Sequence, residues 1–521
     1  MLNILADIMH NAIYPVILLN FILLIILIYW NWGYIWEYLR KINLYSWIFL
    51  LAFVVIAVLI RLYVSPIQHI MYNDEAMYMQ AGKEIMQFGS QGDYPKSIGW
   101  PFILSIVFRI FGLSNITAIY ASVFFGAMTI FALFLLAFII TRNQPVSLAA
   151  SFMFSLFAGH IRWSTTAETS MASLFFMILS MFFALLCFKH KKQPLLWLAA
   201  AGIAFAVQFR PENIFLLFIF LRGYMLYHPV KNTKRLFLPF ILILVIILPN
   251  FVQVLSFQTS QDWLEQESGG EISGPSFGFS NLANNSLNYG MYLFNNEFQP
   301  YLFTLLMLIG LIYGLFKNRK DTLILAGWFA GLWFIYFFSY FQTLGGGLHI
   351  DSKIRFFLNF YPVSVIFMGY GMLFFFNILK KKLPKNIVVP FLAVILAFMF
   401  ISQVETASHT LFSDINHLET IIPEIAEKKF ENCTIIMNFP IILNSTTYLE
   451  LVDIDYVLKH PNKAEKQFDT GCTLFFEDAH CTTWDTHGSK SKCRQFKKAY
   501  ELDSYRRFWK GDSEFIFYRL S

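Results

Sequence analysis

The chain of 521 residues contains few charged residues: Asp, Glu, Lys and Arg make up 14% of it, against about 25% in soluble globular proteins. Hydrophobic residues make up 57%, and Phe occurs 60 times. The apolar runs are continuous and do not alternate with polar residues, which excludes a β-barrel. The net charge of +6 comes mostly from short Lys and Arg clusters between these runs and does not indicate nucleic-acid binding. The composition predicts a polytopic α-helical membrane protein.

Some motifs are also missing. The chain has no phosphate-binding P-loop, so the sequence does not predict an ATP-driven activity. It has neither a CxxC pair nor an HExxH motif. The first apolar run, 12–30, lacks a basic leading segment and a small-residue cleavage site. We therefore interpret it as a membrane span and not as a cleavable signal peptide.

The length of the apolar runs predicts about twelve transmembrane helices, since about 20 apolar residues cross a bilayer. They are 12–30, 46–64, 117–141, 146–160, 169–188, 194–209, 212–228, 235–254, 299–316, 321–341, 354–379 and 386–403. In this arrangement the Lys and Arg clusters all fall on one side, which the positive-inside rule makes cytoplasmic. Loops 65–116, 255–298 and 342–353 then face out. Segment 98–111 is predicted to be an amphipathic helix in the outer interface, because a further span there would invert every later loop.

Three regions follow from this topology: an extra N-terminal span with a cytoplasmic linker (1–45), a transmembrane catalytic domain (46–403) and an extracytoplasmic α/β domain (404–521). In the last region, 433–437 and 472–476 are typical of buried strands, and 413–430 and 493–508 of helices. Four of the five cysteines lie there, on the side where disulfides persist. We favour the pairs Cys433–Cys472 and Cys481–Cys493, with a zinc site as the alternative. Cys187, inside a span, is interpreted as a small apolar residue.

The first long polar break contains the leading candidate site. Asp74 and Glu75 follow a membrane span, in what we predict to be a polar loop that also carries Tyr78, Tyr94 and Trp100. One carboxylate would act as a general base toward an acceptor hydroxyl, and its neighbour would bind a divalent cation or tune the pKa of the base. The alternative is a solvated loop whose acids have no task.

Glu168 lies in the next predicted outer loop, so it could meet Asp74 across a cleft. Two acids from different loops suit a metal bridge, with Mg²⁺ or Mn²⁺ bound by Asp74 and Glu168, or a base with a partner. The alternative places Glu168 in the first turn of a helix capped by Thr165 or Thr166, where an acid favours the helix dipole.

A set of basic residues lies at predicted outer ends of spans, where a lipid phosphate would need cationic partners. The alternative is that these side chains only snorkel to the interface, and Arg210 could simply pair with Glu212. Loop 343–349, with three glycines, could act as a lid. The basic set is Lys96, Arg162, Arg210, His349, Lys353 and Arg355.

Four short motifs occur along the chain in this order: Asp74-Glu75, Gly99-Trp100-Pro101, Arg210-Pro211-Glu212 and the segment 355–362 that begins with Arg355. Their order and spacing resemble the membrane glycosyltransferases of the C-type (GT-C) fold. Within that fold the chain resembles the branch of protein O-mannosyltransferases and lipid A aminoarabinose transferases, that is, glycosyltransferase family 39.

This resemblance implies a donor in which one sugar is linked to polyprenyl or dolichyl phosphate. It implies inverting transfer to a hydroxyl of a glycan, protein or lipid at the outer face of the cell membrane. By this resemblance Asp74 matches the base, Glu168 the second-loop acid that helps to hold metal or acceptor, and Arg355 the arginine of the late motif. Lys96 lies near the donor-phosphate contacts.

The chain also departs from that pattern. Ser97-Ile98 stands where relatives often have a Pro pair, and the oligosaccharyltransferase signature WWDYG is missing. Two other classes of function stay open at this stage. One is a transporter or flippase for lipids or sugars, and the other is a scaffold that displays the C-terminal domain.

Overall fold

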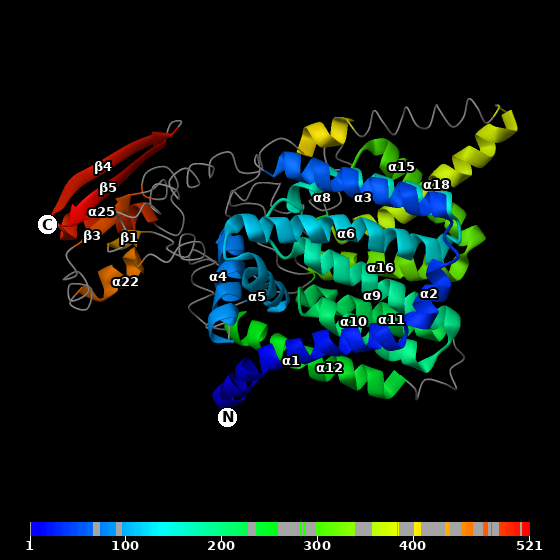
Figure 1. Ribbon diagram of the computed structural model, residues 1–521, viewed down its shortest axis with the longest axis horizontal. Helices are drawn as coiled ribbons and strands as arrows, with labels where there is room; N and C mark the ends of the chain where they lie inside the picture. Colours follow the sequence, from blue (N-terminus) through cyan, green and yellow to red (C-terminus); the bar gives the residue numbers. More distant parts are fainter. Residues whose placement is uncertain are drawn as a thin grey trace.

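The computed structural model describes residues 2–65, 73–89, 96–227, 236–258, 299–338, 357–382, 401–407, 433–437, 450–461, 472–477, 489–510 and 513–520, together with positions 279, 282, 285, 286, 384 and 481. A bundle of helices forms most of the chain, and a small sheet with its helices lies beyond one end of it (Figure 1). We call that end of the bundle, which carries α4 and α5, the α4 end. The opposite end, which carries α2, is the α2 end.

In chain order, the described part of the bundle consists of a series of helices. They are α1 (Leu2–Trp30), α2 (Trp32–Leu39), α3 (Leu44–Val64), α4 (Asn73–Phe88), α5 (Gly99–Phe111), α6 (Asn115–Thr141), α7 (Gln144–Leu156), α8 (Ala158–Trp163), α9 (Ser170–His190), α10 (Gln193–Val207), the 3₁₀ turn η1 (Pro211–Ile214), α11 (Phe215–Tyr227), α12 (Phe237–Gln258), α15 (Tyr301–Lys317), α16 (Arg319–Phe338) and α18 (Tyr361–Lys382).

Six helices in the described part of the chain are long and apolar enough to cross a bilayer: 12–30 of α1, α3, α6, α9, α16 and 361–381 of α18. Shorter apolar helices include α10, α12 and α15. Each predicted span up to 354–379 coincides with a helix or with two consecutive helices, whereas 386–403 lies almost entirely outside the described residues. The chain is a multi-pass membrane protein, and the count of twelve spans stays a prediction.

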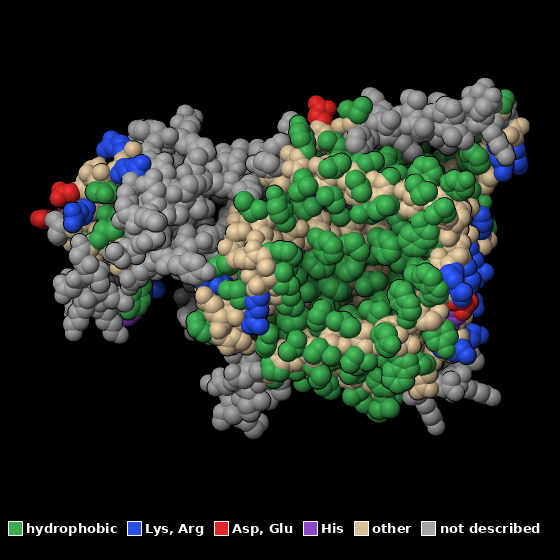
Figure 2. Space-filling model, viewed as in Figure 1, with side chains coloured by type: hydrophobic (Ala, Val, Ile, Leu, Met, Phe, Trp, Pro, Cys, Tyr) green, Lys and Arg blue, Asp and Glu red, His purple; other side chains and the backbone are tan. Residues whose placement is uncertain are grey.

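The turns at the α2 end have local causes. Helix α6 ends at Arg142, whose φ of 52° is the left-handed conformation that closes a helix, and Asn143 then accepts from the Val146 amide at 3.2 Å to cap α7. Lys191 closes α9 in the same way, with a φ of 56°. These hairpin turns coincide with basic clusters, and Figure 2 shows Lys and Arg side chains gathered at this end.

Between the two ends the bundle exposes a broad apolar face (Figure 2). Many large hydrophobic side chains of the bundle are more than half exposed, including Phe49 at 55%, Phe124 at 58% and Phe237 at 65%. Soluble proteins rarely expose contiguous apolar surface of this kind. The face therefore fits contact with lipid, in agreement with the composition.

The prediction of a polar loop after α3 was wrong, because residues 73–88 form helix α4, which packs on α5. Asp74 and Glu75 occupy the first turn of α4, where acids stabilise a helix N-terminus. Gly82 allows the close approach, since a Cβ there would lie 2.9 Å from the Cβ of Leu104. The predicted helix at 98–111 is confirmed as α5.

The C-terminal domain contains a five-stranded sheet in the order β2-β1-β3-β5-β4. The strands are β1 (Thr434–Met437), β2 (Glu450–Asp453), β3 (Thr473–Glu477), β4 (Leu502–Lys510) and β5 (Ser513–Leu520). β1 pairs in parallel with β2 and β3, and β5 pairs antiparallel with β3 and β4. The helices α22 (Ile454–Lys459) and α25 (Ser489–Ala499) accompany them.

The two predicted buried strands and both predicted disulfides, Cys433–Cys472 and Cys481–Cys493, are confirmed. The predicted helix 493–508 is only half right: α25 ends at Ala499, and residues 502–510 form β4. The long antiparallel pairing with β5 decides the outcome, and such a nonlocal contact is invisible to a local pattern. Predicted helix 413–430 lies outside the described residues.

Candidate active site

Asp74 and Lys96 form an ion pair at the α4 end of the bundle. The Lys96 ammonium group donates to Oδ1 of Asp74 and also lies 5.5 Å from the ring centre of Tyr78, one turn further along α4. The pair is half-buried, since the Asp74 side chain is 19% exposed and that of Lys96 is 30% exposed. The carboxylate predicted to be the base therefore has a cationic partner, and both side chains are partly accessible at the surface of the protein.

The segment that follows Lys96, which we call the strap (residues 96–100), is held by three different parts of the bundle. The Ile98 amide donates to Oδ1 of Asn250 on α12 at 3.2 Å, and the Gly99 amide donates to the carbonyl of Gln208 at 2.7 Å. The indole of Trp100 donates to the carbonyl of Ala167 at 2.7 Å. The strap thus brings Lys96 into fixed relation with the segments that carry Glu168 and Arg210.

Glycine is required at position 99 of the strap. A Cβ on Gly99 would lie 2.7 Å from the carbonyl oxygen of Gln208, a distance that real Cβ atoms do not reach. Trp100 is fully buried, and it packs edge-on against Phe125 at 6.0 Å between ring centres. Trp100, predicted as part of a substrate loop, thus serves as an anchor between two loops.

Glu168 and Arg210 form a second ion pair, which is buried. Arg210 donates to Oε1 of Glu168 at 3.0 Å and to Oε1 of Glu212 at 3.1 Å. The other oxygen of Glu168 accepts from the backbone amide of Ser170 at 2.7 Å and from its hydroxyl.

The interpretation in which Thr165 or Thr166 caps a helix with Glu168 in its first turn was wrong. Helix α9 begins at Ser170 and its N-cap is Thr169, while Thr165 and Thr166 donate to the carbonyls of Arg162 and Trp163. Glu168 precedes the helix, binds the amide of Ser170 and pairs with Arg210 from another loop.

The electrostatics of Arg210 connect the two pairs. Burial lowers the pKa of the Arg210 guanidinium, but the carboxylates of Glu168 and Glu212 outweigh that effect and hold its pKa above the ordinary value. The phenols of Tyr78 and Tyr336 lie close enough to act on Arg210 in the same direction. Tyr78 thus contacts the Lys96 ammonium group and also influences the pKa of Arg210 electrostatically.

The remaining predicted site residues have other places. Glu75 is buried, at 1% exposed. Arg162, on α8, is also buried and donates to the carbonyl of Thr406 in the last described helical segment of the bundle, so it holds two parts of the bundle together. Four predicted residues lie outside the described residues: Tyr94, His349, Lys353 and Arg355.

Polar residues inside the spans also support the site, and sequence reasoning missed them. Asn250 holds the strap, and Asn20 on α1 donates to the side chain of Gln208 at 3.3 Å. Asn359, within the late motif, donates to the hydroxyl of Tyr336 at 3.0 Å. A signal was available, because amides within membrane spans are costly and commonly functional.

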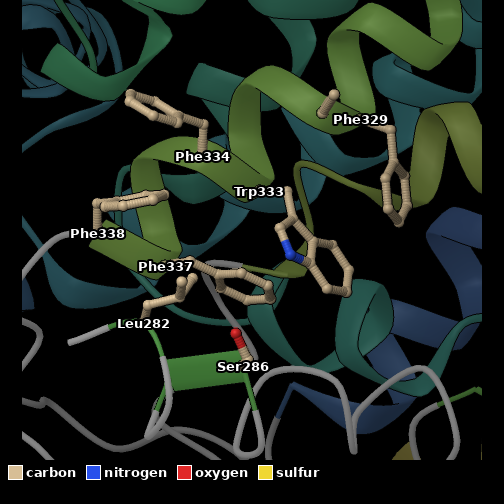
Figure 3. Close-up of a pocket in the computed structure, with 8 residues that line it drawn as sticks. Leu282, Ser286, Phe329, Trp333, Phe334, Phe337 and Phe338 are labelled. Atoms are coloured by element: carbon tan, nitrogen blue, oxygen red, sulfur yellow. The ribbon is translucent and has the colours of Figure 1, made fainter. Parts of the chain in front are cut away.

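An apolar groove of ≈ 510 Å³ borders the C-terminal half of α16. Its aromatic wall is shown in Figure 3, where the indole of Trp333 lies between the rings of Phe329 and Phe337. Asn285 donates to the carbonyls of Tyr336 and Phe337 at 3.1 and 3.0 Å, which fixes the edge of the groove. The groove thus adjoins Tyr336, whose phenol helps to raise the pKa of Arg210. Its lining residues are Leu282, Ser286, Phe329, Ala330, Trp333, Phe334, Phe337 and Phe338.

A metal centre was predicted between Asp74 and Glu168. Among the described residues, no group of three or more His, Cys, Asp or Glu side chains is placed to hold a metal ion. Asp74 and Glu168 each pair with a basic side chain instead. The divalent cation stays an untested prediction, and we assign it no step.

The family model for dolichyl-phosphate-mannose-protein mannosyltransferases matches residues 95–257, which include the strap, Glu168, Arg210 and Asn250. No curated protein sequence matches the chain. In solved structures, ArnT of Cupriavidus metallidurans bound to undecaprenyl phosphate is similar at a TM-score of 0.58 and 14% identity, covering 91% of this chain and 98% of that one.

The oligosaccharyltransferase of Archaeoglobus fulgidus, tethered to an acceptor peptide, is similar at a TM-score of 0.54 and 11% identity, over 88% of this chain and 72% of that one. At these identities the structural likeness establishes the fold, which is shared over most of the chain. Together with the matched family model, it confirms that the chain resembles the C-type fold membrane glycosyltransferases in the branch of the protein O-mannosyltransferases and ArnT.

Proposed function

We propose that this protein is a membrane glycosyltransferase that transfers a single sugar from a polyprenyl- or dolichyl-phosphate donor to an acceptor hydroxyl. The observation that carries the proposal is the strap, which follows the Asp74–Lys96 ion pair and is bonded to Gln208 and Ala167, close in sequence to the residues of the Glu168–Arg210 ion pair, in a bundle with this fold. The family model matched over the strap and ArnT's bound undecaprenyl phosphate support the class of donor.

In the proposed reaction, Asp74 is the general base. It takes the proton of the acceptor hydroxyl while the acceptor oxygen attacks the anomeric carbon of the donor sugar from the face opposite the phosphate. The bond between that carbon and the phosphate oxygen breaks, and the electron pair stays on the lipid phosphate. Attack from the opposite face inverts the anomeric configuration.

Lys96 is the proposed partner of the departing phosphate, because its ammonium group is partly exposed and sits beside the base. Arg210 is held by two carboxylates and by the Ser170 hydroxyl, so we assign it a smaller, long-range contribution of positive charge. Glu168 then orients Arg210 and fixes the start of α9, and Glu75 assists from the buried side of α4.

We propose that the groove on α16 binds the part of the isoprenoid chain nearest the phosphate. Its lining is apolar and aromatic apart from Ser286, and its volume lies within the range of about 300–1,000 Å³ typical of ligand pockets. Tyr336, on the same helix, would lie at the boundary between the apolar groove and the charged site.

The orientation is part of the proposal. The Lys and Arg side chains gathered at the α2 end favour placing that end in the cytoplasm (Figure 2). The α4 end, with the ion pairs, then faces outward, together with the disulfide-bonded C-terminal domain. The membrane would be the cell membrane, and the acceptor a glycan, protein or lipid reached from outside.

The test is a transfer assay in membranes that contain the purified protein, with a panel of radiolabelled lipid-phosphate sugars and arms with added Mg²⁺, Mn²⁺ or EDTA. Wild type is expected to move label to an acceptor, and Asp74→Asn is expected to lose at least about 100-fold in rate, the usual contribution of a general base. The matched control is Glu37→Gln, because Glu37 is an exposed carboxylate on α2 that also pairs with a lysine, Lys41.

Glu37→Gln should transfer at the wild-type rate. Full activity of folded Asp74→Asn would remove Asp74 from the role of base. Failure of folded wild type to transfer from any donor would favour the transporter or flippase interpretation.

A further inference from the structure

Asp74 and Lys96 have opposite tasks in the proposed reaction, yet the structure joins them. A base must accept a proton, and a cation bonded to its carboxylate makes that harder. A lysine that receives a phosphate must have donors to offer, and Lys96 donates to Oδ1 of Asp74. In this arrangement neither group is ready for the step assigned to it.

The surroundings of the pair allow the lysine to move while its backbone stays in place. The strap is fixed by Asn250, Gln208 and Ala167, which hold the three residues next along the chain from Ser97. The side chain of Lys96 is 30% exposed and has four flexible carbons with three donors at its end. The Tyr78 ring, 5.5 Å away, gives the ammonium group a second favourable contact as it leaves Asp74.

The other pair of the site is built differently. Arg210 is 8% exposed and Glu168 is 2% exposed, and each has further partners in Glu212 and Ser170. Breaking a buried pair of this kind leaves a charge buried without its partner, whereas a partly exposed pair is weak because solvent replaces the lost contact. A ligand could therefore exchange the partner of Lys96 but not that of Arg210.

We propose that the phosphate of the arriving donor lipid draws Lys96 away from Asp74 and thereby activates the carboxylate as the base. The inference rests on the proposed function. It makes donor binding the first step, since Asp74 takes the acceptor's proton only after Lys96 has moved. It also returns the site to rest: when the lipid phosphate leaves, Lys96 pairs with Asp74 again as the proton is lost to solvent.

The test measures binding of undecaprenyl phosphate, which requires no transfer, to four purified proteins: wild type, Asp74→Asn, Lys96→Met and the double variant. If the phosphate competes with Asp74 for Lys96, Asp74→Asn binds more tightly than wild type, by up to about fivefold for a partly exposed pair. In the Lys96→Met background the same substitution leaves the affinity unchanged, because nothing remains to compete for.

Two results would overturn the inference. One is equal affinity of wild type and Asp74→Asn. The other is an equal gain in both backgrounds, which would mean that the carboxylate merely repels the phosphate. In a Lys96→Arg background, which keeps the positive charge, Asp74→Asn should still tighten binding. The thermal unfolding midpoints of all variants establish that they are folded.

Two further ligands define the chemistry. Undecaprenol, which lacks the phosphate, should bind all four proteins alike, and a gain for Asp74→Asn with undecaprenol would contradict a competition for Lys96. Inorganic phosphate should show no gain at the same concentration, and an equal gain there would contradict a lipid-borne phosphate. If wild type binds undecaprenyl phosphate without the predicted coupling, only this inference fails. If it does not bind, the proposed function fails too.

Discussion

At the α2 end of the bundle Lys189 donates to Oδ2 of Asp321 at 2.8 Å, and at the α4 end Lys96 pairs with Asp74, but the two pairs have different surroundings. Asp321 is 2% exposed, and it also accepts from Asn318 at 2.6 Å and from the hydroxyl of Tyr227. Asp74 is 19% exposed.

The cluster at the α2 end ties helix ends together. Lys189 belongs to α9, Tyr227 to α11 and Asp321 to α16, and Asn318 also donates to the carbonyl of Ile140 in α6 at 2.8 Å. A tilted ring contact between Tyr34 of α2 and His190, at 5.9 Å between ring centres, connects α2 to the end of α9. The comparison teaches that two lysine–carboxylate pairs of one bundle differ in burial. The buried pair at the α2 end is suited to stabilising the fold, and the partly exposed pair at the α4 end is accessible to a ligand.

The largest effect on stability is expected from Lys189→Met. It leaves the Asp321 carboxylate buried without its cation, which costs about 3–5 kcal/mol in the free energy of unfolding. Thermal unfolding in detergent would measure the loss. The double variant with Asp321→Leu should recover most of it, because removing both charges avoids the unpaired one, and transfer per folded molecule should stay near wild type. An unchanged midpoint for Lys189→Met would contradict the structural role.

Glu168→Gln should have an intermediate effect. It weakens the charged hydrogen bonds from Arg210 and Ser170, which are worth about 1.5–3 kcal/mol, and it disturbs the site, so both stability and transfer should fall. Glu212→Gln is the matched control, since Glu212 faces the same arginine but is 17% exposed. Equal losses from the two variants would mean that the burial of Glu168 does not matter.

The smallest effect on stability is expected from Lys96→Met, at or below about 1 kcal/mol, because its pair with Asp74 is partly exposed. Transfer should nevertheless fall strongly, since the departing phosphate loses its cation. Lys96→Arg should retain part of the rate. A Lys96→Met protein that unfolds easily but transfers normally per folded molecule would reverse the comparison between the two ends.

Much of the bundle could be predicted from the sequence. Apolar runs of span length such as 46–64 and 117–141 correspond to α3 and α6. In a bilayer a helix satisfies the backbone hydrogen bonds of an apolar segment internally. The Cys433–Cys472 disulfide could also be predicted, since each of its cysteines directly precedes a strand that could be recognised as buried. Helix α4 was missed because its packing against α5 through Gly82 is a tertiary contact.

The assignment of Asp74, Lys96, Glu168 and Arg210 to a site stays a prediction, but the structure adds the pairings between them. No spacing rule in the sequence joins positions 168 and 210 or pairs Lys96 with Asp74. Asn250 was invisible because its importance depends on the strap lying against α12. Long-range polar contacts follow from the fold, whereas span length follows from the chain.

The measurement that tests the account most directly is the rate of sugar transfer per folded molecule for Asp74→Asn and Asp321→Asn, the two carboxylates at opposite ends of the bundle. The account predicts that Asp74→Asn folds with nearly wild-type stability and transfers at least about 100-fold more slowly. It predicts that Asp321→Asn unfolds more easily but transfers at nearly the wild-type rate once folded. A fully active Asp74→Asn protein would contradict the placement of the chemistry at the α4 end.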